Sequence, residues 1–417
     1  MTIDLPPAPP ERHGWPWTAQ AGAPPTDSSG LPRITVVTPS YNQGQFLEAT
    51  LRSVLLQGYP NLEYFVIDGG STDNSVEIIR RYAPHLDYWE SERDRGQTHA
   101  IMKGFARASG AVLAWLNSDD MYLPGALQTV GAVFAAQPQA GLVYGAAQHI
   151  EPSGEPRPDR PCARPYERRW MLEQSNMVPQ PAAFVTAKAY HAAGGLVEAR
   201  HWLMDWDLWL RMGEQSPPVF VARDLAQMRI YAAAKFQSRD RKLYAEFFEL
   251  VERHGHHTLP KSLRQRLIKT QLALADEAAQ RGDLDAARDE LDFVLETLPD
   301  LQDSAALAAT LARYAWQEHR ETRRPALDIA APLVAALPAR LHAPREVRGL
   351  TLGLVHEALA FEAARQGQPG KVWQHTGRAF GANPRQLRNR GLWSLAARSL
   401  FGRRPAGPPD SEEAAGP

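Results

Sequence analysis

The sequence is poor in cysteine and has no long apolar run. A single cysteine, Cys162, among 417 residues excludes an intrachain disulfide and a zinc site built from several cysteines. No stretch approaches the ~18 consecutive apolar residues of a membrane-spanning helix. The first residues have no basic start followed by an apolar core, as a secretory signal would have, so we expect a cytoplasmic protein.

Neither sign of charge dominates the chain. Lys and Arg total 46 and Asp and Glu total 47, which leaves a net charge of −1. Proteins that bind nucleic acid over a wide surface normally have a basic excess, so we expect no nucleic-acid partner. A hydrophobic content of 44% with 22% charged residues is typical of a globular protein.

The composition divides the chain into four parts. Residues 1–30 are rich in Pro, Gly, Ser and Thr and lack periodicity, which predicts a flexible arm. Residues 31–240 alternate short apolar runs with amphipathic segments, which predicts an α/β domain. Residues 241–402 are dominated by helix formers and predict an all-α domain, and residues 403–417 predict a disordered tail.

The alternation in the α/β part predicts a mostly parallel, Rossmann-like sheet with helices on both faces. The predicted strands are Ile34–Pro39, Leu62–Asp68, Ala111–Asn117 and Gly141–Ala147. The predicted helices are Gln45–Leu56, Asn74–Tyr82, Thr98–Ala108 and Ala126–Ala136.

The all-α part contains two segments with the same plan. Gln271–Pro299 and His356–Pro384 each read as two amphipathic helices joined near a glycine, Gly282 or Gly367, and each ends in proline. This plan resembles a tetratricopeptide-type helix pair, and a plain helical bundle is the alternative. We expect this domain to dock a protein partner or a second copy of the chain.

Polar residues suited to ligand binding follow three of the predicted strands. These strand ends are Thr38–Asn42, Asp68–Asp73 and Asn117–Asp120. In an open parallel sheet, ligands bind outside the carboxyl ends of the strands. A carboxylate directly after an apolar strand is poorly placed for a core and well placed to hold a base, a ribose or a metal.

The adjacent carboxylates Asp119 and Asp120 are the strongest of these signals. Two carboxylates at a buried strand end repel each other unless a cation joins them. Mg²⁺ and Mn²⁺ take oxygen ligands and share phosphate oxygens. The pair therefore predicts a clamp for a metal and a diphosphate, and an Asp-rich turn before the helix near Pro124 is the alternative.

Four strings with a specific order lie between residues 33 and 240. They are TPSYNQGQF and its continuation (Thr38–Tyr82), YWESERDRGQ through WLNSDDMYLPGAL (Tyr88–Leu127), QPAAF (Gln180–Phe184) and MDWDLWLRM (Met204–Met212). The series resembles family 2 glycosyltransferases of the GT-A fold. The resemblance implies a nucleotide-sugar donor, Mn²⁺ or Mg²⁺, and an inverting transfer of hexosyltransferase type.

The resemblance assigns roles to residues at the strand ends. Pro39 and Tyr41 match the loop that packs on the nucleobase and ribose, and Asp68 matches the aspartate that contacts the base. Asp119 and Asp120 match the metal and ribose motif, with Asp120 as the direct ligand. The alternative for Tyr41 is a loop aromatic that covers the sheet edge.

A charged loop follows Trp89. By resemblance it lies along the sugar and diphosphate of the donor, with Asp94 in contact with the donor and Arg95 neutralising phosphate charge. A solvated charged loop is the alternative. Met102 stands where relatives usually carry Asn, which removes one hydrogen-bonding position from the donor site.

Asp205 is the candidate general base. It stands where the resemblance places the carboxylate that takes the proton of the attacking acceptor hydroxyl. Asp207 would point to another face of a helix and support the segment. The tryptophans Trp202, Trp206 and Trp209 could line a sugar site, and the alternative is that two of them belong to the core.

Tyr231 departs from the family pattern. Many relatives carry a histidine metal ligand at the position that Tyr231 occupies here, two residues after Arg229. A phenol is a poor ligand for Mg²⁺ or Mn²⁺ unless it is ionised. We therefore expect the metal to be held by Asp120, the diphosphate and water.

These features predict a glycosyltransferase of polysaccharide biosynthesis. The donor would be a nucleoside-diphosphate sugar, UDP-linked in the first instance, and the acceptor a glycan, a lipid-linked or another hydroxyl. Met102 and Tyr231 motivate an alternative, a weakly active or inactive nucleotide-sugar-binding or assembly protein. A nucleotidyltransferase is disfavoured because TPSYNQGQF lacks a basic, glycine-rich phosphate loop.

The segment Arg385–Arg404 mixes arginines with leucine and aromatic residues. A basic amphipathic stretch of this kind suits an anionic lipid surface and predicts peripheral contact with the inner face of a membrane. The alternative is that its apolar residues cap the core of the helical domain.

Overall fold

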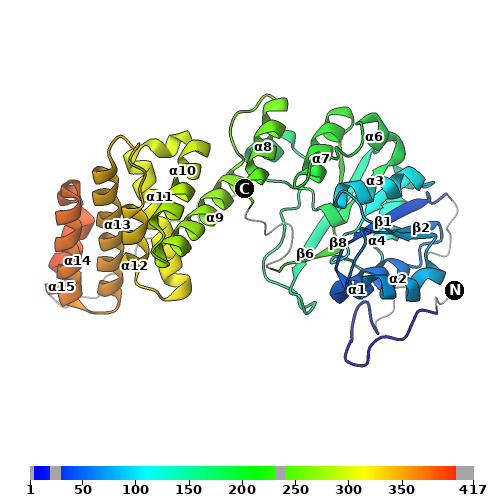
Figure 1. The fold of residues 1–417 in the computed structure, drawn as a ribbon, viewed down its shortest axis with the longest axis horizontal. Coiled ribbons are helices and arrows are strands. Elements are labelled where there is room, and N and C mark those ends of the chain that lie inside the picture. Colours follow the sequence, from blue (N-terminus) through cyan, green and yellow to red (C-terminus); the bar gives the residue numbers. More distant parts are fainter. Residues whose placement is uncertain (1–3, 19–29, 232–239, 401–417) are drawn as a thin grey trace. The chain divides into compact units, whose positions relative to one another are not determined.

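The computed structural model describes residues 4–18, 30–231 and 240–400, and the chain separates into two compact units, Met1–Leu263 and Arg264–Pro417 (Figure 1). The predicted tail 403–417 lies outside the described residues. The first unit is an α/β domain and the second is helical, as the sequence predicts.

The described residues of the first unit form one eight-stranded sheet in the order β3-β2-β1-β4-β7-β6-β8-β5. Its strands are β1 (Ile34–Ser40), β2 (Leu62–Asp68), β3 (Tyr88–Ser91), β4 (Val112–Trp115), β5 (Met121–Tyr122), β6 (Leu142–Ile150), β7 (Ala183–Thr186) and β8 (Val219–Arg229). The strands β3, β2, β1 and β4 are parallel neighbours, and so are β6 and β8. β7 is antiparallel to both β4 and β6, and β5 to β8, so the sheet is mixed.

Helices cover both faces of the sheet (Figure 1). The helices of this unit are α1 (Gly44–Leu55), α2 (Ser75–Tyr82), α3 (Gln97–Arg107), α4 (Ala126–Ala136), α5 (Arg168–Glu173), α6 (Ala187–Ala192), α7 (Met204–Gln215) and α8 (Lys242–Arg253), with short 3-10 turns η1 (Ala83–His85) and η2 (Gln180–Ala182). Alternate strand residues face opposite sides. Val36 packs in a core with Leu51 of α1, and Trp115 packs on the other side against Phe105 of α3 and Trp209 of α7.

The first unit extends past the boundary at residue 240 that the sequence suggested. Helix α8 places Phe247 and Leu250 in fully buried positions, and the Phe247 ring lies 5.2 Å from that of Trp206 in α7. The apolar face of α8 thus completes the core of the α/β unit, which runs to Leu263.

Residues 4–18 pack on the α/β unit, which differs from the flexible arm expected over 1–30. The buried Arg52 of α1 donates to the carbonyl oxygens of Pro6 at 2.7 Å and Pro16 at 3.1 Å, and its guanidinium lies over the Trp17 ring. Trp17 packs against a small buried cluster that includes Met121. Partners distant in sequence therefore order a segment whose composition alone predicts a flexible chain; residues 1–3 and 19–29 lie outside the described residues.

The second unit is helical, and the last five of its described helices pack on their neighbours in chain order. The helices of this unit are α9 (Lys261–Gln280), whose first turn belongs to the first unit, α10 (Leu284–Thr297), α11 (Ser304–Thr322), α12 (Ala326–Ala335), α13 (Pro344–Arg365), α14 (Pro369–Ala382) and α15 (Arg390–Leu400), with 3-10 turns η4 (Pro299–Gln302) and η5 (Pro384–Arg388). α13 packs against α11 and α12 and against α14 and α15 (Figure 1). Both helix pairs expected from the sequence form.

Glycines in left-handed conformation end the first helix of each pair. Gly282 has φ +80° between α9 and α10, and Gly367 has φ +68° between α13 and α14. Residues other than glycine rarely adopt this conformation, which lets a helix end and the chain reverse. Across the described residues of both units, no helix is long and apolar enough to cross a membrane.

Candidate active site at the carboxyl ends of the strands

The loops after β1 and β2 are joined by hydrogen bonds. Asn42, in left-handed conformation with φ 52°, accepts from the backbone N–H of Thr72 at 2.8 Å, and its own N–H donates to Ser71 Oγ at 2.8 Å. Asp73 accepts from the N–H of Gly44 at 2.9 Å. These contacts bring two of the three predicted strand ends together.

Asp68 is buried and shapes the loop that follows it. Its carboxylate accepts from the N–H groups of Gly70 at 3.1 Å and Ser71 at 2.9 Å. It also accepts from the hydroxyls of Ser71 at 2.5 Å and Ser91 at 2.7 Å. Asp68 thus holds the loop at the predicted donor site.

The charged loop before α3 packs onto the loop after β2. Asp94 accepts from the N–H of Gly96 at 2.8 Å, and a β-carbon added at Gly69 would lie 2.9 Å from Asp94 Oδ2. Gly69 is therefore needed for the close approach. Arg95 lies at the surface in a two-point ion pair with Glu198, with Nη2 to Oε2 at 3.0 Å, so a phosphate would compete with Glu198 for it.

Asp119 and Asp120 are anchored from two elements, α1 and the end of β8. The side chain of Thr50 donates to the Asp120 carbonyl at 2.7 Å, and the N–H of Arg229 donates to Asp120 Oδ1 at 3.1 Å. The Arg229 guanidinium donates to the Asp119 carbonyl at 3.0 Å and stacks 4.5 Å from the centre of the Phe46 ring. These bonds hold the turn that carries both carboxylates.

The two carboxylates are electrostatically costly without a cation. Burial raises the pKa of Asp119, against the effect of hydrogen bonding from Tyr231. Burial and then the charge of Asp119 raise the pKa of Asp120 well above its usual range. A divalent cation between them would relieve both effects, because it supplies positive charge where the protein has excluded water.

Tyr231 bonds to the pair as a neutral phenol. Its hydroxyl donates to Asp119 Oδ2 at 2.8 Å and accepts from the side-chain amide of Gln43 at 2.9 Å. Burial, reinforced by the charge of Asp119, raises the pKa of Tyr231, so the phenol stays protonated at neutral pH. Tyr231 therefore positions Asp119 through a donated hydrogen bond.

The carboxylate oxygens of Asp119 and Asp120 suit a hard divalent cation whose remaining ligands come from a bound diphosphate and water. No group of three or more His, Cys, Asp or Glu side chains suited to a metal occurs among the described residues. Mg²⁺ and Mn²⁺ are commonly bound by one or two carboxylates together with substrate phosphates and water. The protein would supply Asp119 and Asp120, and the remaining ligands would come from a diphosphate.

Hydrogen bonds and contacts connect this pair to the segment of Asp205. Asn117 donates to Asp120 at 3.3 Å and to Gln180 at 3.0 Å, and accepts from Gln97 at 2.6 Å. Thr98, the next residue of α3, contacts Met204 at 2.9 Å between its hydroxyl and the sulfur.

Asp205 follows Met204 in the first turn of α7 and receives a long 3.5 Å contact from the Asn176 amide. Asp205 thus follows a residue that contacts α3, the helix whose first residue, Gln97, donates to Asn117.

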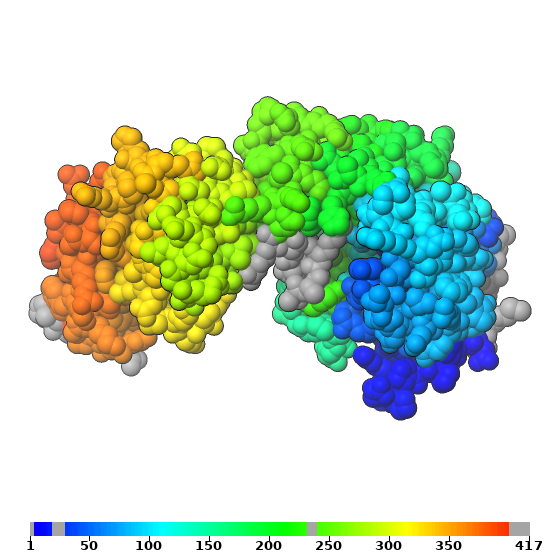
Figure 2. All heavy atoms as spheres, in the orientation of Figure 1, coloured from blue at the N-terminus to red at the C-terminus, as the bar shows by residue number. Residues whose placement is uncertain are grey.

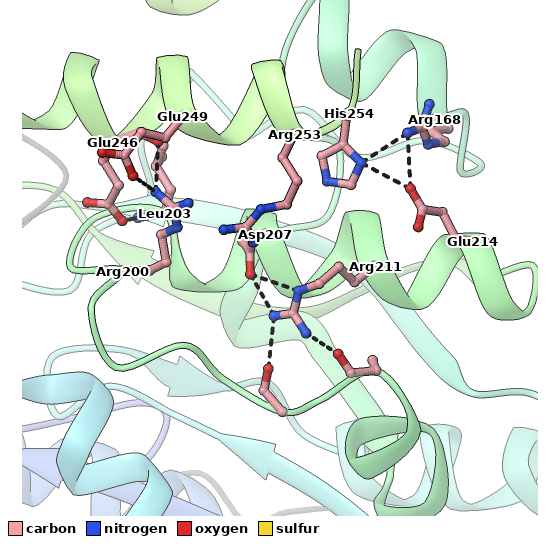
Figure 3. A network of polar contacts seen from close by, with 12 residues as sticks. Arg168, Arg200, Leu203, Asp207, Arg211, Glu214, Glu246, Glu249, Arg253 and His254 are labelled. Atoms are coloured by element: carbon pink, nitrogen blue, oxygen red, sulfur yellow. Dashed lines mark hydrogen bonds and ion pairs between the residues drawn. The ribbon is translucent and has the colours of Figure 1, made fainter. Parts of the chain in front are cut away.

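Asp207 is structural, as the sequence suggested. It is fully buried and accepts from Arg211 of the same helix at 2.6 Å and from Arg253 of α8 at 3.2 Å (Figure 3). Trp206 and Trp209 are also buried, and the Trp209 ring stacks on Trp115 at 5.6 Å, so these two tryptophans belong to the core. Trp202 is partly exposed.

Glu246 of α8 caps α7 from outside that helix. Its carboxylate accepts from the N–H groups of Trp202 at 3.0 Å and Leu203 at 3.1 Å (Figure 3). Leu203 is the N-cap residue of α7 and offers no side-chain cap. A carboxylate here satisfies free N–H groups and matches the positive end of the helix dipole. Helix α8 thereby fixes the helix end that carries Asp205.

The end of β1 carries buried polar atoms without partners. The hydroxyl of Ser40 and the amide oxygen of Gln43 make no hydrogen bond within the described residues. Unpaired buried polar atoms are uncommon and mark places where a ligand or water binds. Pro39 is buried within β1, whereas Tyr41, two residues further on, is 61% exposed, so its ring is available for stacking.

Sequence reasoning assigned no role to Gln43, Thr50 and Glu246, and it named Asn117 and Gln180 only as members of a strand end and of a matched string. Gln43 and Asn117 stand within strings that were singled out, so the polar residue after an apolar strand was the available signal. Glu246 gives no signal, because it is one of many glutamates on an amphipathic helix.

Comparison with known proteins finds relatives of the α/β unit. An uncharacterized glycosyltransferase of Mycobacterium tuberculosis is 33% identical over 171 residues, 40% of this chain and 63% of the relative. The Bacillus subtilis protein TuaG, provisionally named as a glycosyltransferase of teichuronic acid biosynthesis, is 36% identical over 96 residues, 22% of this chain and 37% of the relative. The chain thus spans less than two thirds of the length of these relatives.

Among solved structures, TarS of S. aureus in complex with UDP-GlcNAc is similar, with a TM-score of 0.45 and 13% sequence identity over 81% of this chain and 92% of that chain. Residues 35–191 match the family model described as Glycosyl transferase family 2. This match runs from β1 through the Asp119-Asp120 turn to α6. The α/β unit of this chain therefore carries a glycosyl transferase family 2 domain.

Proposed function

We propose that the α/β unit transfers a hexosyl group, with inversion, from a nucleoside-diphosphate sugar to a hydroxyl acceptor. The observation that carries this proposal is the Asp119-Asp120 pair, two mutually repelling carboxylates at a strand end within a family 2 domain. The unpartnered atoms of Ser40 and Gln43 and the exposed Tyr41 ring support a donor site beside it. By resemblance the donor is UDP-linked.

The residues of the chain have distinct tasks in this proposal. Mn²⁺ or Mg²⁺, when bound, would neutralise the charge that develops on the diphosphate leaving group. Asp120 and Asp119 would hold the ion, and Tyr231 keeps the Asp119 carboxylate in place. The loop shaped by Asp68 and Asp94 would position the nucleoside and sugar.

Asp205 would act as the general base. The acceptor oxygen attacks the anomeric carbon, the bond from that carbon to the diphosphate oxygen breaks, and Asp205 takes the hydroxyl proton. A single displacement of this kind inverts the anomeric centre. The cap from Glu246 and the buried pairs of Asp207 hold α7 in place for this step.

We place the reaction in polysaccharide biosynthesis in the cytoplasm, with a glycan or lipid-linked acceptor. The name of the relative TuaG and the family resemblance support this assignment. The helical unit would dock a protein partner or a second copy, because its stacked helix pairs have a repeat-like, tetratricopeptide-like plan.

A donor screen tests the proposal. UDP-, GDP- and dTDP-sugars are added with Mn²⁺ and thermal stability is measured, since a ligand of the native state raises the melting temperature by mass action. The matching donor should then release nucleoside diphosphate. Release of pyrophosphate would indicate nucleotidyl transfer, and failure of every donor to stabilise the protein would contradict the proposed site.

Tyr231 and Met102 favour one alternative, a nucleotide-sugar-binding assembly protein with weak or no turnover. Tyr231 occupies one oxygen of Asp119, and Met102 is a partly buried apolar residue of α3. The same assay separates the two functions. An assembly protein would be stabilised by donor and Mn²⁺ but would release no nucleoside diphosphate.

A further inference from the structure

Large exposed apolar side chains gather on the last elements of the helical unit. Exposed large apolar residues in the described ranges are Tyr41, Leu284, Trp373, Leu387 and Trp393. The last three come from α14, η5 and α15, with exposures of 39%, 51% and 46%. Such residues scattered singly need no explanation, whereas a group on one surface marks an interaction site.

A ring contact and a hydrogen bond connect α14, η5 and α15 beside these residues. Trp373 and Phe380 are seven residues apart on α14 and so share a face of that helix. The Phe380 ring packs on the Trp393 ring with centroids 4.8 Å apart. The Trp393 indole donates to the Leu387 carbonyl at 2.8 Å. We call Trp373, Leu387 and Trp393 the aromatic surface.

The other apolar residues of α15 serve the core. Leu392 and Leu395 are buried and pack with Ala360 and Val372 of α13 and α14. The capping role considered from the sequence therefore applies to these two leucines. Trp393 and Leu387 remain exposed and take no part in that packing, so the aromatic surface lies outside the core. The part of the predicted segment beyond Leu400 lies outside the described residues.

The stretch of sequence that carries the aromatic surface is basic. Between Gln366 and Leu400 the sequence holds one lysine and five arginines and neither Asp nor Glu. Arg385 pairs with Glu346 at 3.2 Å, and the nearby Glu357 of α13 accepts from Asn389 at 2.7 Å.

The remaining cations of this stretch are Lys371, Arg378, Arg388, Arg390 and Arg398. All five are exposed, and within the ranges that the structure covers they form no ion pair. Arg390 and Trp393 are three residues apart on the outer side of α15, so charge and aromatic ring share that side.

We infer that this end of the helical unit binds the surface of a bilayer that contains anionic lipids. Figure 2 shows the residues of α14 and α15, in orange to red, together on an outer face of the unit. Tryptophan favours the interface between headgroups and acyl chains, and each basic residue near an anionic surface adds attraction. The chain as a whole is near neutral, so the attraction is local to this face.

A lipid surface accounts for the aromatic surface better than a polyanion does. The most exposed member is Leu387, which gains by leaving water but has no ring to stack on a base. A bilayer interface takes leucine and tryptophan together while arginines contact phosphate headgroups. With few apolar residues available, the binding is reversible and sensitive to salt. This inference does not depend on the proposed transfer reaction.

Co-sedimentation of the full chain with vesicles tests the inference. Vesicles of phosphatidylcholine alone are compared with vesicles that also contain phosphatidylglycerol, at low and at raised salt. We expect the chain to sediment with the anionic vesicles at low salt and to stay in the supernatant with the neutral ones. Arg388→Ala with Arg390→Ala should weaken binding by roughly fivefold for each arginine. Leu387→Ser should also weaken it, and the effect should persist when salt is raised.

Matched variants elsewhere in the unit separate the surface from general effects. Leu284→Ser removes a leucine of 39% exposure from α10, and Arg281→Ala removes an exposed arginine, and neither should alter sedimentation. Thermal melting of each variant shows that it is folded. The inference is overturned if the native chain stays in the supernatant at low salt. It is also overturned if the surface variants sediment like the controls, or if heparin or single-stranded DNA binds the native chain while anionic vesicles do not.

Discussion

The two units differ in how many charged side chains they bury. In the α/β unit the buried charged side chains of the described residues are Arg52, Glu63, Asp68, Asp120, Arg200, Asp207, Arg229 and Glu246. In the helical unit the corresponding set is Asp276 alone, which pairs with Arg324 at 2.6 Å. The two cores also differ in composition. The core of the helical unit consists mainly of leucine and alanine.

The difference separates buried charges that have an ion-pair partner from those that face a like charge. Asp207 and Asp276 are both satisfied by arginine, so each contributes to the stability of its own unit. Asp120 lies beside a second carboxylate and its pKa is raised, so burial there opposes folding. A protein retains such an arrangement when the site binds something that compensates for it.

The largest effects on turnover and stability are expected when one buried carboxylate in each unit is replaced by an amide. Asp120→Asn should lower turnover by roughly 10³-fold or more, equivalent to about 4 kcal/mol, since the leaving group loses its charge clamp. Its melting temperature should stay level or rise, because the amide relieves repulsion with Asp119. Nucleoside diphosphate release and thermal melting measure the two effects.

Asp276→Asn is the control in the helical unit. It should lower stability by about 1–3 kcal/mol, because it weakens a buried pair with Arg324, while turnover below the melting range is unchanged. A stability loss in Asp120→Asn as large as that of Asp276→Asn would show that Asp120 is a structural residue.

A second comparison uses two aspartates of one helix. Asp205→Asn should reduce the transfer rate by ~10²–10⁴-fold with donor binding and melting nearly intact, the usual effect of removing a general base. Asp207→Asn should instead lower stability by about 3 kcal/mol, because both Arg211 and Arg253 lose their buried partner. Donor affinity, initial rate and melting are measured on both variants. If Asp205→Asn loses binding and rate together, it does not act as a base.

The boundary between the units can be tested by shortening the chain. A protein that ends at Leu263 should fold and bind donor, since it keeps the whole α/β unit. A protein that ends at Asp240 lacks Phe247, Glu246 and Arg253 and should be destabilised by more than about 3 kcal/mol, the effect of losing one buried aromatic residue. Denaturant unfolding compares the two lengths. Equal stability would mean that α8 belongs to the helical unit.

The smallest expected effect concerns two histidines of the helical unit. His356 of α13 and His375 of α14 have their Nδ1 atoms 3.1 Å apart, so one must donate to the other. Burial, followed by the charge of His375, lowers the pKa of His356 to about 4, and burial also lowers the pKa of His375. The folded unit therefore favours neutral rings.

The sign of the pH dependence follows from these lowered pKa values. The unfolded chain takes up protons near pH ~6.5 and the folded one at lower pH, so stability is present above ~6.5 and is lost as the pH falls toward 4. At about pH 5 the loss is roughly 2 kcal/mol. His356→Gln should reduce the change in melting temperature between these pH values. An unchanged slope in that variant would assign the pH dependence to other groups.

Much of the fold could be predicted because its main signals are local. The predicted strands at 34–39 and 62–68 form almost as expected, since fully buried parallel strands appear as continuous apolar runs. β3 and β8 were missed, because their side chains are mostly half-buried or exposed and so produce no such run. The packing of residues 4–18 was not predicted, because a proline-rich composition does not reveal a partner such as Arg52.

By itself the sequence determined that polar and acidic residues follow the apolar strands, and it predicted the site there. A carboxylate after an apolar strand has few structural uses, so Asp68, Asp119 and Asp120 could be found from order along the chain. Only the tertiary structure decided what each one does. Asp68 holds a loop, Tyr231 donates to Asp119, and Glu246 caps the helix of Asp205. These roles depend on segments distant in sequence meeting in space, and helical or strand periodicity contains no information about such encounters.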